Sequence, residues 1–327
     1  MRHLIEPHPD WPEDVDPPRF DRIRCLVLPG TARGAHADLE IVEGDIRDSR
    51  AVERFCAGAE GATVFHLAGS MRARRVRELF EVNARGTQHL IAAASRARVK
   101  RIVATSSNSP VGESRDPSTR FDESAPYRPQ MAYGRSKKLM EDALNAANAA
   151  DLTETVILRP CWFYGPDQPP HQTLFFRLIE SGRAPIVAGG TARRSMSYVD
   201  NAVLGLLLAA ARPEAAGETY WIADERPYSM NEVVDTVEDL LEWEFGRTVA
   251  HRRLRLPGVV SELAHGLDGA LQLAGVYQQK VHVLSVMNKT IACSIGKAKR
   301  ELGYLPAVEL REGMRRSIEC CLERGEL

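Results

Sequence analysis

Features that would place the chain in a specialised class of protein are missing from its sequence. Its 327 residues include 43 basic and 44 acidic side chains, a formal net charge of −1. The basic excess typical of proteins that coat nucleic acid or a membrane surface is therefore absent. The longest apolar run, 202–211, is about half the ~20 residues that a membrane-spanning helix needs. We expect a globular, cytoplasmic protein with no membrane span and no nucleic-acid partner.

Cysteine is also scarce. The six cysteines are irregularly spaced and form no CxxC motif, so we expect free thiols in a reducing compartment and no metal site. The first 22 residues lack the apolar stretch of a signal peptide and contain five prolines and six acids. Because proline removes backbone donors and fixes φ, residues 1–22 are expected to form an extended arm and not a central strand with a helix.

From residue 23 onward, short apolar runs alternate with helical periodicity. The runs are rich in β-branched residues and lie at 23–28, 39–42, 62–69, 101–107 and 155–160. Runs of this kind are typical of parallel strands buried on both faces by helices. The pattern predicts an α/β fold, a doubly wound parallel-sheet (Rossmann-like) domain over 23–165, with later strands returning from 190–225.

The regular alternation of apolar runs with helical periodicity ends after residue 165. An apolar helix is expected at 199–211, a capping box at Ser229–Glu232 opens another, and a last helix carries apolar residues from 310 to 322. We expect 166–327 to form mostly a smaller, mainly helical substrate-binding lobe over the carboxyl edge of the sheet, where such folds bind ligands. The amphipathic stretch 256–277 could pack on the core of this lobe or form an apolar lid over substrate.

Tyr133 and Lys137 lie four residues apart at the start of a predicted helix and so share one face. A phenol ordinarily has a pKa near ~10, and a cation one turn away favours the phenolate and lowers that pKa. Thr105, Ser106 and Ser107 end an apolar run, which places a hydroxyl at the same edge of the sheet. Ser107, Tyr133 and Lys137 together could polarise a carbonyl and protonate its oxygen.

These motifs follow an order that resembles the extended short-chain dehydrogenases/reductases of the NAD-dependent epimerase/dehydratase type. The matching segments are GDIRD (44–48), VFHLAG (64–69), VNARGTQHLI (82–91), TSSNSPVG (105–112), YGRSK (133–137), LRPCWFYGP (158–166), RRSMSYVDN (193–201) and SIGKAKRELGYLP (294–306). Three segments resemble the 3β-hydroxysteroid dehydrogenase branch more than the nucleotide-sugar epimerases. They are YVDN (198–201), the apolar stretch 256–277 and CSIGKAKRELGY (293–304).

The resemblance implies a role for each matching residue. Ser107 would hydrogen-bond the substrate oxygen, Tyr133 would act as the acid/base, and Lys137 would lower the pKa of Tyr133 and bind the nicotinamide ribose. The implied cofactor-binding residues are Asp45, Ile46, Leu67, Ala68, Gly69, Thr105, Tyr133, Lys137, Pro160 and Cys161, and the implied substrate residues are Ser107, Trp162 and Arg194. Asn83 matches a position that is structural or forms a proton relay. The implied cofactor is NAD or NADP, and the implied assembly is a homodimer through helices at 80–98 and 133–150.

The sequence departs from the family at one element. The GxxGxxG turn, whose following helix holds the cofactor pyrophosphate at its N-terminus, is absent, and the early glycines Gly30, Gly34, Gly44 and Gly58 do not have its spacing. We therefore expect the sheet to lack its first βα unit, which lies at the centre of the 3-2-1-4-5-6 strand order. The arm or another chain could fill the gap, and a truncated reading frame would also explain it.

Four functions remain open on the sequence. The first is an NAD(P)-dependent oxidoreductase acting on a hydroxyl or ketone of an apolar, steroid- or polyketide-like small molecule. The second is a non-redox acid/base enzyme, such as an isomerase, cyclase or dehydratase, that has lost dinucleotide binding. A nucleotide-sugar epimerase or dehydratase is a further alternative, in which Arg194 would meet a phosphate. The last is a binding or regulatory protein that has kept the fold without catalysis.

Overall fold

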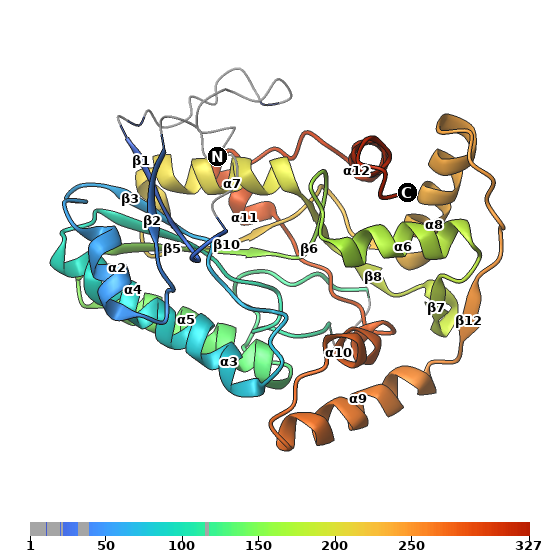
Figure 1. The fold of residues 1–327 in the computed structure, drawn as a ribbon, viewed down its shortest axis with the longest axis horizontal. Coiled ribbons are helices and arrows are strands. Elements are labelled where there is room, and N and C mark those ends of the chain that lie inside the picture. The colour runs from blue at the N-terminus through green and yellow to red at the C-terminus, as the bar shows by residue number, and fades with distance from the viewer. Residues whose placement is uncertain (1–10, 12–19, 21, 32–38, 115–117) are drawn as a thin grey trace.

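A computed structural model describes residues 11, 20, 22–31, 39–114 and 118–327 (Figure 1). The arm expected at 1–22 lies almost wholly outside the described residues. Parallel strands confirm the predicted α/β class. The larger parallel sheet contains, in chain order, β3 (Thr63–His66), β4 (Arg101–Thr105), β5 (Glu154–Pro160) and β10 (Thr219–Ile222). Its spatial order is β10-β5-β4-β3, and every pair in it is parallel.

Two more strands stand apart from this sheet. β1 (Ile23–Val27) and β2 (Leu39–Glu43) pair in parallel with each other, and in the described part of the chain neither is hydrogen-bonded to β3. Each of the five strands expected before residue 165 is thus present. In the described part of the chain these strands form two separate sheets, and the expected absence of a first strand between them stays a prediction.

Helices cover the larger sheet on both faces. One face carries α2 (Ser49–Cys56), α3 (Val76–Phe80), the π-turn η1 (Glu81–Arg85), α4 (Gly86–Arg96) and α5 (Met131–Ala149), and the other carries α7 (Val199–Ala211) and α11 (Gly296–Leu302) (Figure 1). Two apolar cores result. Val64, Ile102 and Ile157 pack under α4 and α5, whereas Val103 and Val156 pack under α7 and α11.

Apart from β10, α7 and α11, the elements after β5 are short strands and helices, which we call the C-terminal lobe. Its strands are β6 (Trp162–Tyr164), β7 (Pro185–Val187), β8 (Arg193–Arg194), β9 (Met196–Tyr198), β11 (Tyr228–Ser229) and β12 (Leu254–Leu256). Its helices and turns are α6 (Pro170–Glu180), η2 (Ala188–Gly190), η3 (Pro213–Ala215), α8 (Met230–Asp239), η4 (Leu240–Glu244), α9 (Val259–Leu273), α10 (Gln279–Val286) and α12 (Leu310–Glu323). The predicted cap of α8 is confirmed, because the Ser229 hydroxyl accepts the Glu232 N–H at 3.1 Å. None of the helices in the described ranges is long and apolar enough to cross a membrane.

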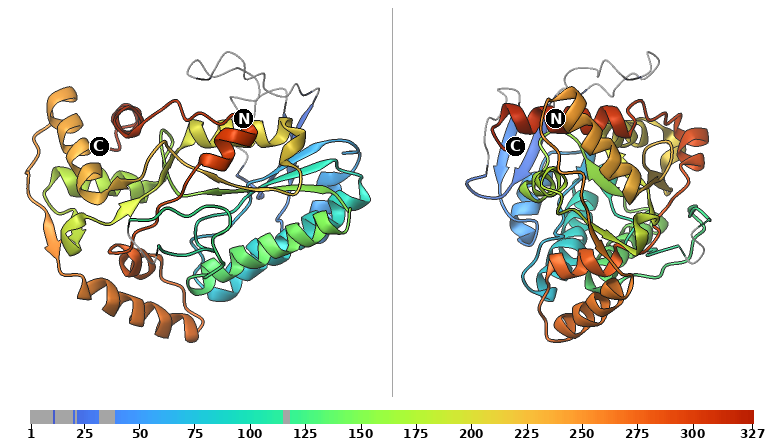
Figure 2. Two further views of the ribbon diagram at one scale, coloured as in Figure 1. Left: turned by 180° about the vertical axis from the view of Figure 1, so that it is seen from behind. Right: turned by 90° about the vertical axis from the view of Figure 1, so that its right-hand side faces the viewer.

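Helix α9 departs from one of the two expectations for residues 256–277. Packing on the core of the lobe would bury the apolar side of the helix, but Leu263 and Leu267 are exposed and the polar side chains of Asp268 and Gln272 are buried. That expectation is therefore wrong. The helix lies at the margin of the molecule in the views of Figures 1 and 2.

Candidate active site

The carboxyl end of β4 and the start of α5 bring the predicted catalytic residues together. The Lys137 ammonium lies beneath this strand end and donates to the Thr105 carbonyl at 2.9 Å and to the Met140 sulfur at 3.4 Å. Lys137 is only 5% exposed. Burial lowers the pKa of Lys137 to about 8, and the nearby charge of Glu141 opposes that shift. Charge on this lysine is therefore sensitive to pH near neutrality.

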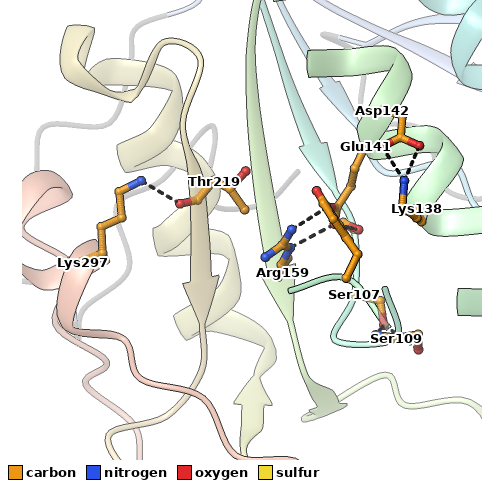
Figure 3. Close-up of polar contacts among 10 residues, drawn as sticks. Ser107, Ser109, Lys138, Glu141, Asp142, Arg159, Thr219 and Lys297 are labelled. Atoms are coloured by element: carbon orange, nitrogen blue, oxygen red, sulfur yellow. Dashed lines mark hydrogen bonds and ion pairs between the residues drawn. The ribbon is translucent and has the colours of Figure 1, made fainter. Parts of the chain in front are cut away.

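Ser107 and Tyr133 face the same space from the loop after β4 and from the first turn of α5. The Ser107 hydroxyl lies 3.2 Å from the Ser109 hydroxyl and accepts the Ser109 N–H at the same distance (Figure 3). Burial raises the pKa of Tyr133, and a hydrogen bond with Ser107 lowers it by less. The Lys137 ammonium is directed at the Thr105 carbonyl, and the expected lowering of the Tyr133 pKa by Lys137 stays a prediction.

Asn83 connects the loop after β3 to α5, the helix that carries Tyr133 and Lys137, through hydrogen bonds. Its side-chain oxygen accepts the Ser70 N–H at 2.7 Å, and its NH₂ group donates to the Ser70 carbonyl at 2.9 Å and to the Ser136 hydroxyl at 3.0 Å. A Cβ on Gly69 would lie 3.4 Å from both the Asn83 oxygen and the Lys137 nitrogen. With all its polar atoms engaged in this way, Asn83 holds the site in place, which favours the structural interpretation.

A buried ion pair that sequence reasoning missed lies one helical turn beyond Lys137. The Glu141 carboxylate pairs with Arg159 at 2.7 Å (Figure 3). It also accepts hydroxyl hydrogen bonds from Ser106 at 2.5 Å and Tyr127 at 2.6 Å. Both charged side chains are at most 3% exposed. The four-residue step from Lys137 to Glu141 was a usable signal, but the contact with Arg159 joins α5 to β5 and is not local in sequence.

Two residues of the C-terminal lobe, Gln272 and Tyr277, also contact α5. The Gln272 side-chain oxygen accepts the Ala132 N–H at 2.8 Å, so α9 supplies the N-terminal cap that α5 lacks in its own side chains. The backbone of Tyr277 donates to the Arg74 carbonyl at 3.1 Å, and its ring packs against Ala132 and Tyr133. No motif in the sequence indicated these contacts.

The residues implied for the adenine half of the cofactor lie after β2. Asp45 accepts from the Arg47 guanidinium at 2.6 Å, and this contact lowers the pKa of Asp45. Asp45 and Arg47 line an open depression of about 420 Å³ together with Asp48, Glu81 and Arg85. Ile46 is buried, and its side chain would collide with a Cβ on Gly86.

The strand end that the resemblance places along the cofactor is accessible. Leu67, Ala68 and Gly69 are exposed after β3, so a ligand can lie along them. The Thr105 hydroxyl is buried and has no hydrogen-bond partner among the residues that the structure describes. Leu67–Gly69 and the Thr105 hydroxyl could therefore contact a ligand, whereas the sequence has no GxxGxxG turn for a pyrophosphate and Asp45 is already paired with Arg47.

The remaining predicted residues lie where β5 enters the lobe. Pro160 and Cys161 are buried; the Cys161 N–H donates to the Ser197 hydroxyl at 3.0 Å, and its sulfur is 3.7 Å from that of Cys293. Trp162 packs against the Phe175 ring with centroids 6.0 Å apart.

Arg194, the implied contact to substrate, donates to the Val286 carbonyl at the end of α10, and burial lowers its pKa to about 10. The side chains of Trp162 and Arg194 are thus engaged within the lobe.

Comparison with known proteins shows which family this chain resembles in sequence. A model described as the NAD dependent epimerase/dehydratase family matches residues 26–223. An uncharacterized protein of Sinorhizobium fredii is 49% identical, over 93% of this chain and 86% of its own length. A 3 beta-hydroxysteroid dehydrogenase/Delta 5-->4-isomerase of Mycobacterium tuberculosis is 31% identical, over 90% of this chain and 80% of its own.

A solved structure is similar over nearly the whole chain. It is DesIV, a dTDP-glucose 4,6-dehydratase of Streptomyces venezuelae with NAD and TYD bound, which is 25% identical with a TM-score of 0.75. The match covers 99% of this chain and 93% of that one.

Proposed function

The chain belongs to the NAD-dependent epimerase/dehydratase family, and we propose that it is an oxidoreductase that interconverts a hydroxyl group and a ketone on an apolar, steroid- or polyketide-like small molecule, with NAD or NADP as the redox partner. The observation that carries the proposal is the convergence of Ser107, Tyr133 and Lys137 at the carboxyl edge of the sheet. The similarity to the mycobacterial 3 beta-hydroxysteroid dehydrogenase/Delta 5-->4-isomerase supports the apolar substrate class.

In this proposal the protein's own residues handle the proton. A bound nicotinamide would supply or accept the hydride. Tyr133 would donate its phenolic proton to the ketone oxygen, and Ser107 would donate a second hydrogen bond to the same oxygen. Because burial raises the pKa of Tyr133, the phenol is held protonated and ready to donate in the direction of reduction. The charge on Lys137, fixed by the Thr105 carbonyl, would stabilise the phenolate that results.

Binding of the cofactor in this proposal depends on few residues. Lys137 would hold the nicotinamide ribose, the exposed segment Leu67–Gly69 would lie along the cofactor, and the unpartnered hydroxyl of Thr105 offers a further polar contact. Asp45 would have to leave Arg47 or share it with the ligand. We therefore expect dinucleotide affinity to be weaker than in relatives that carry the GxxGxxG turn.

Calorimetric titration and turnover test the proposal together. The wild-type protein should bind at least one of NAD+, NADH, NADP+ and NADPH, and it should reduce or oxidise a member of a panel of apolar ketones and alcohols that begins with 3β-hydroxysteroids. Tyr133→Phe should lower kcat by about 100-fold or more while nucleotide binding persists. Tyr220→Phe is the matched control, because that hydroxyl bonds Glu301 on the far side of the sheet. Absence of heat with all four nucleotides would overturn the redox proposal.

A second candidate is a non-redox acid/base enzyme on the same scaffold. It is favoured by two observations: the glycine-rich turn is missing from the sequence, and Asp45 is already paired with Arg47. Isomerisation or dehydration by nucleotide-free protein, abolished in Tyr133→Phe, would support it. A nucleotide-sugar substrate is less favoured, because Arg194 is engaged with Val286 within the lobe.

A further inference from the structure

The start of α5, the helix that carries Tyr133, is capped from another part of the chain. The N-cap residue Gln130 makes no side-chain capping hydrogen bond. Met131 has a φ of 51°, a left-handed conformation that is strained for a residue with a side chain. The N–H of the next residue, Ala132, is accepted at 2.8 Å by the side-chain oxygen of Gln272 on α9. The strained turn that leads into Tyr133 is thus supported by the C-terminal lobe.

Gln272 belongs to a buried chain of three hydrogen-bonded side chains. Its NH₂ group donates to one oxygen of the Asp268 carboxylate at 2.8 Å, and Nδ1 of His282 on α10 donates to the other at 2.8 Å. Gln272 is 7% exposed and Asp268 is fully buried. An ionised carboxylate only accepts and a backbone N–H only donates, so the direction of each hydrogen bond is fixed. Asp268 therefore holds the Gln272 amide with its oxygen toward Ala132.

The end of α9 is anchored near the site by its backbone as well. The N–H of Val76, the first residue of α3, donates to the Gly275 carbonyl at 3.0 Å. Two residues further on, the ring of Tyr277 packs against Tyr133. Because α9 is joined at this end to both α3 and α5, Gln272 contacts the start of α5 from a fixed position.

We propose that Gln272, oriented by the Asp268 carboxylate, is a positioning residue for Tyr133. By accepting the Ala132 N–H it holds the first turn of α5, and with it the Tyr133 hydroxyl, in place beside Ser107. Proton transfer requires hydrogen-bond distance, so a small displacement of the phenol lowers turnover strongly. The inference rests on the proposed function through the role of Tyr133, and it applies to the redox and the non-redox candidate alike.

The fixed direction of the hydrogen bonds allows a test by reversal. Asp268→Asn places an NH₂ group against that of Gln272, and a Gln272 amide that turned over would direct its NH₂ group at the Ala132 N–H. In Asp268→Asn/Gln272→Glu the new amide donates to the new carboxylate, which accepts the Ala132 N–H, and His282 keeps an acceptor. The double variant therefore restores the chain that Asp268→Asn breaks.

Steady-state kinetics with the full chain measures the effect. Gln272→Leu and Asp268→Asn should each lower kcat by about tenfold or more and change KM by less than about threefold, and the double variant should recover kcat to within about threefold of wild type. Ser261→Ala is the matched control. The buried Ser261 hydroxyl donates to the Leu284 carbonyl at 2.8 Å and so joins α9 to α10, not to α5. Its loss should lower the melting temperature and leave kcat unchanged.

Fluorine NMR of protein that contains 3-fluorotyrosine follows Tyr133 without turnover. The Tyr133 resonance, assigned by its absence in Tyr133→Phe, should shift in Gln272→Leu and Asp268→Asn and return in the double variant. No turnover by the wild-type protein would overturn the proposed function, whereas the resonance would still test the positioning.

Three results would overturn the positioning role. They are an unmoved Tyr133 resonance in Gln272→Leu, a loss of kcat in Ser261→Ala equal to that in Gln272→Leu, and a double variant that melts like wild type yet remains as impaired as Asp268→Asn. If the double variant does not fold, the comparison of Gln272→Leu with Ser261→Ala decides.

Discussion

The two parallel sheets of the described chain, β10-β5-β4-β3 and β1-β2, differ in how completely they are buried. In β4 four of five residues are buried, and in β5 six of seven. No residue of β1 or β2 is fully buried. Parallel strands normally require cover on both faces and hydrogen-bonded neighbours. β4 has both, whereas β1 has only β2 as a hydrogen-bonded neighbour among the described residues.

The difference separates the two ends of the proposed cofactor site. Thr105, Ser107 and Lys137 stand on or against the buried strands, where packing and hydrogen bonds fix them within a dense core. Asp45 follows β2, which is joined to β1 by backbone pairing and by ion pairs such as Arg24 with Glu40 at 2.9 Å. We infer that the reacting end of the site is more rigid than the end that would hold adenine.

The largest expected effect comes from breaking the buried part at Glu141. Glu141→Ala leaves the Arg159 charge and the hydroxyls of Ser106 and Tyr127 without their shared partner, so the free energy of unfolding should fall by about 3–5 kcal/mol. Urea denaturation measures the change.

The matched variant in the other part is Glu40→Ala. Its partner Arg24 keeps hydrogen bonds to the Phe55 and Ala57 carbonyls, so the loss should be less than about 1 kcal/mol. Equal losses for Glu40→Ala and Glu141→Ala would show that the two sheets do not differ in the way their burial indicates.

The same contrast explains what could be predicted from sequence. The strands and the set Ser107, Tyr133 and Lys137 could be predicted because apolar runs and short motifs are local signals. The Glu141–Arg159 pair could not, because its members are on different elements and either could have paired elsewhere. The orientation of α9 was missed because the apolar pattern favours burying Leu263, whereas contacts with Leu284, His282 and Ala132 decide which face turns inward.

The next effect has the opposite sign and concerns Lys137. Burial lowers its pKa from 10.5 to about 8. Its charge therefore destabilises the folded protein at every pH below about 8, and this penalty disappears as the pH rises from about 8 to 10.5. Lys137→Met should abolish turnover yet raise the free energy of unfolding at pH 7 by as much as about 3 kcal/mol.

Comparison of unfolding at two pH values provides the control for Lys137→Met. The gain over wild type should be largest at pH 7 and should shrink at pH 10, where the wild-type lysine is mostly neutral when folded. Lys138→Met, at a half-exposed lysine paired with Asp142, should show no such dependence. A variant less stable than wild type at pH 7 would mean that the bond to Thr105 outweighs the penalty of burial.

The smallest effect is expected at Asp45, in the less buried part. Arg47 lowers the pKa of Asp45, so this pair stabilises the folded protein above the ordinary pKa of 3.8 and the contribution is lost on acidification below it. Asp45→Asn should therefore lower the free energy of unfolding at pH 7 by about 0.5 kcal/mol, and by progressively less as the pH falls below 3.8. The pH dependence is opposite to that of Lys137→Met, because the Asp45 charge is partly exposed and paired with Arg47 whereas the Lys137 charge is buried. If Asp45→Asn instead lost several kcal/mol, β2 and the loop after it would have to be as rigid as β4, and the weak dinucleotide binding proposed for this chain would lose its structural basis.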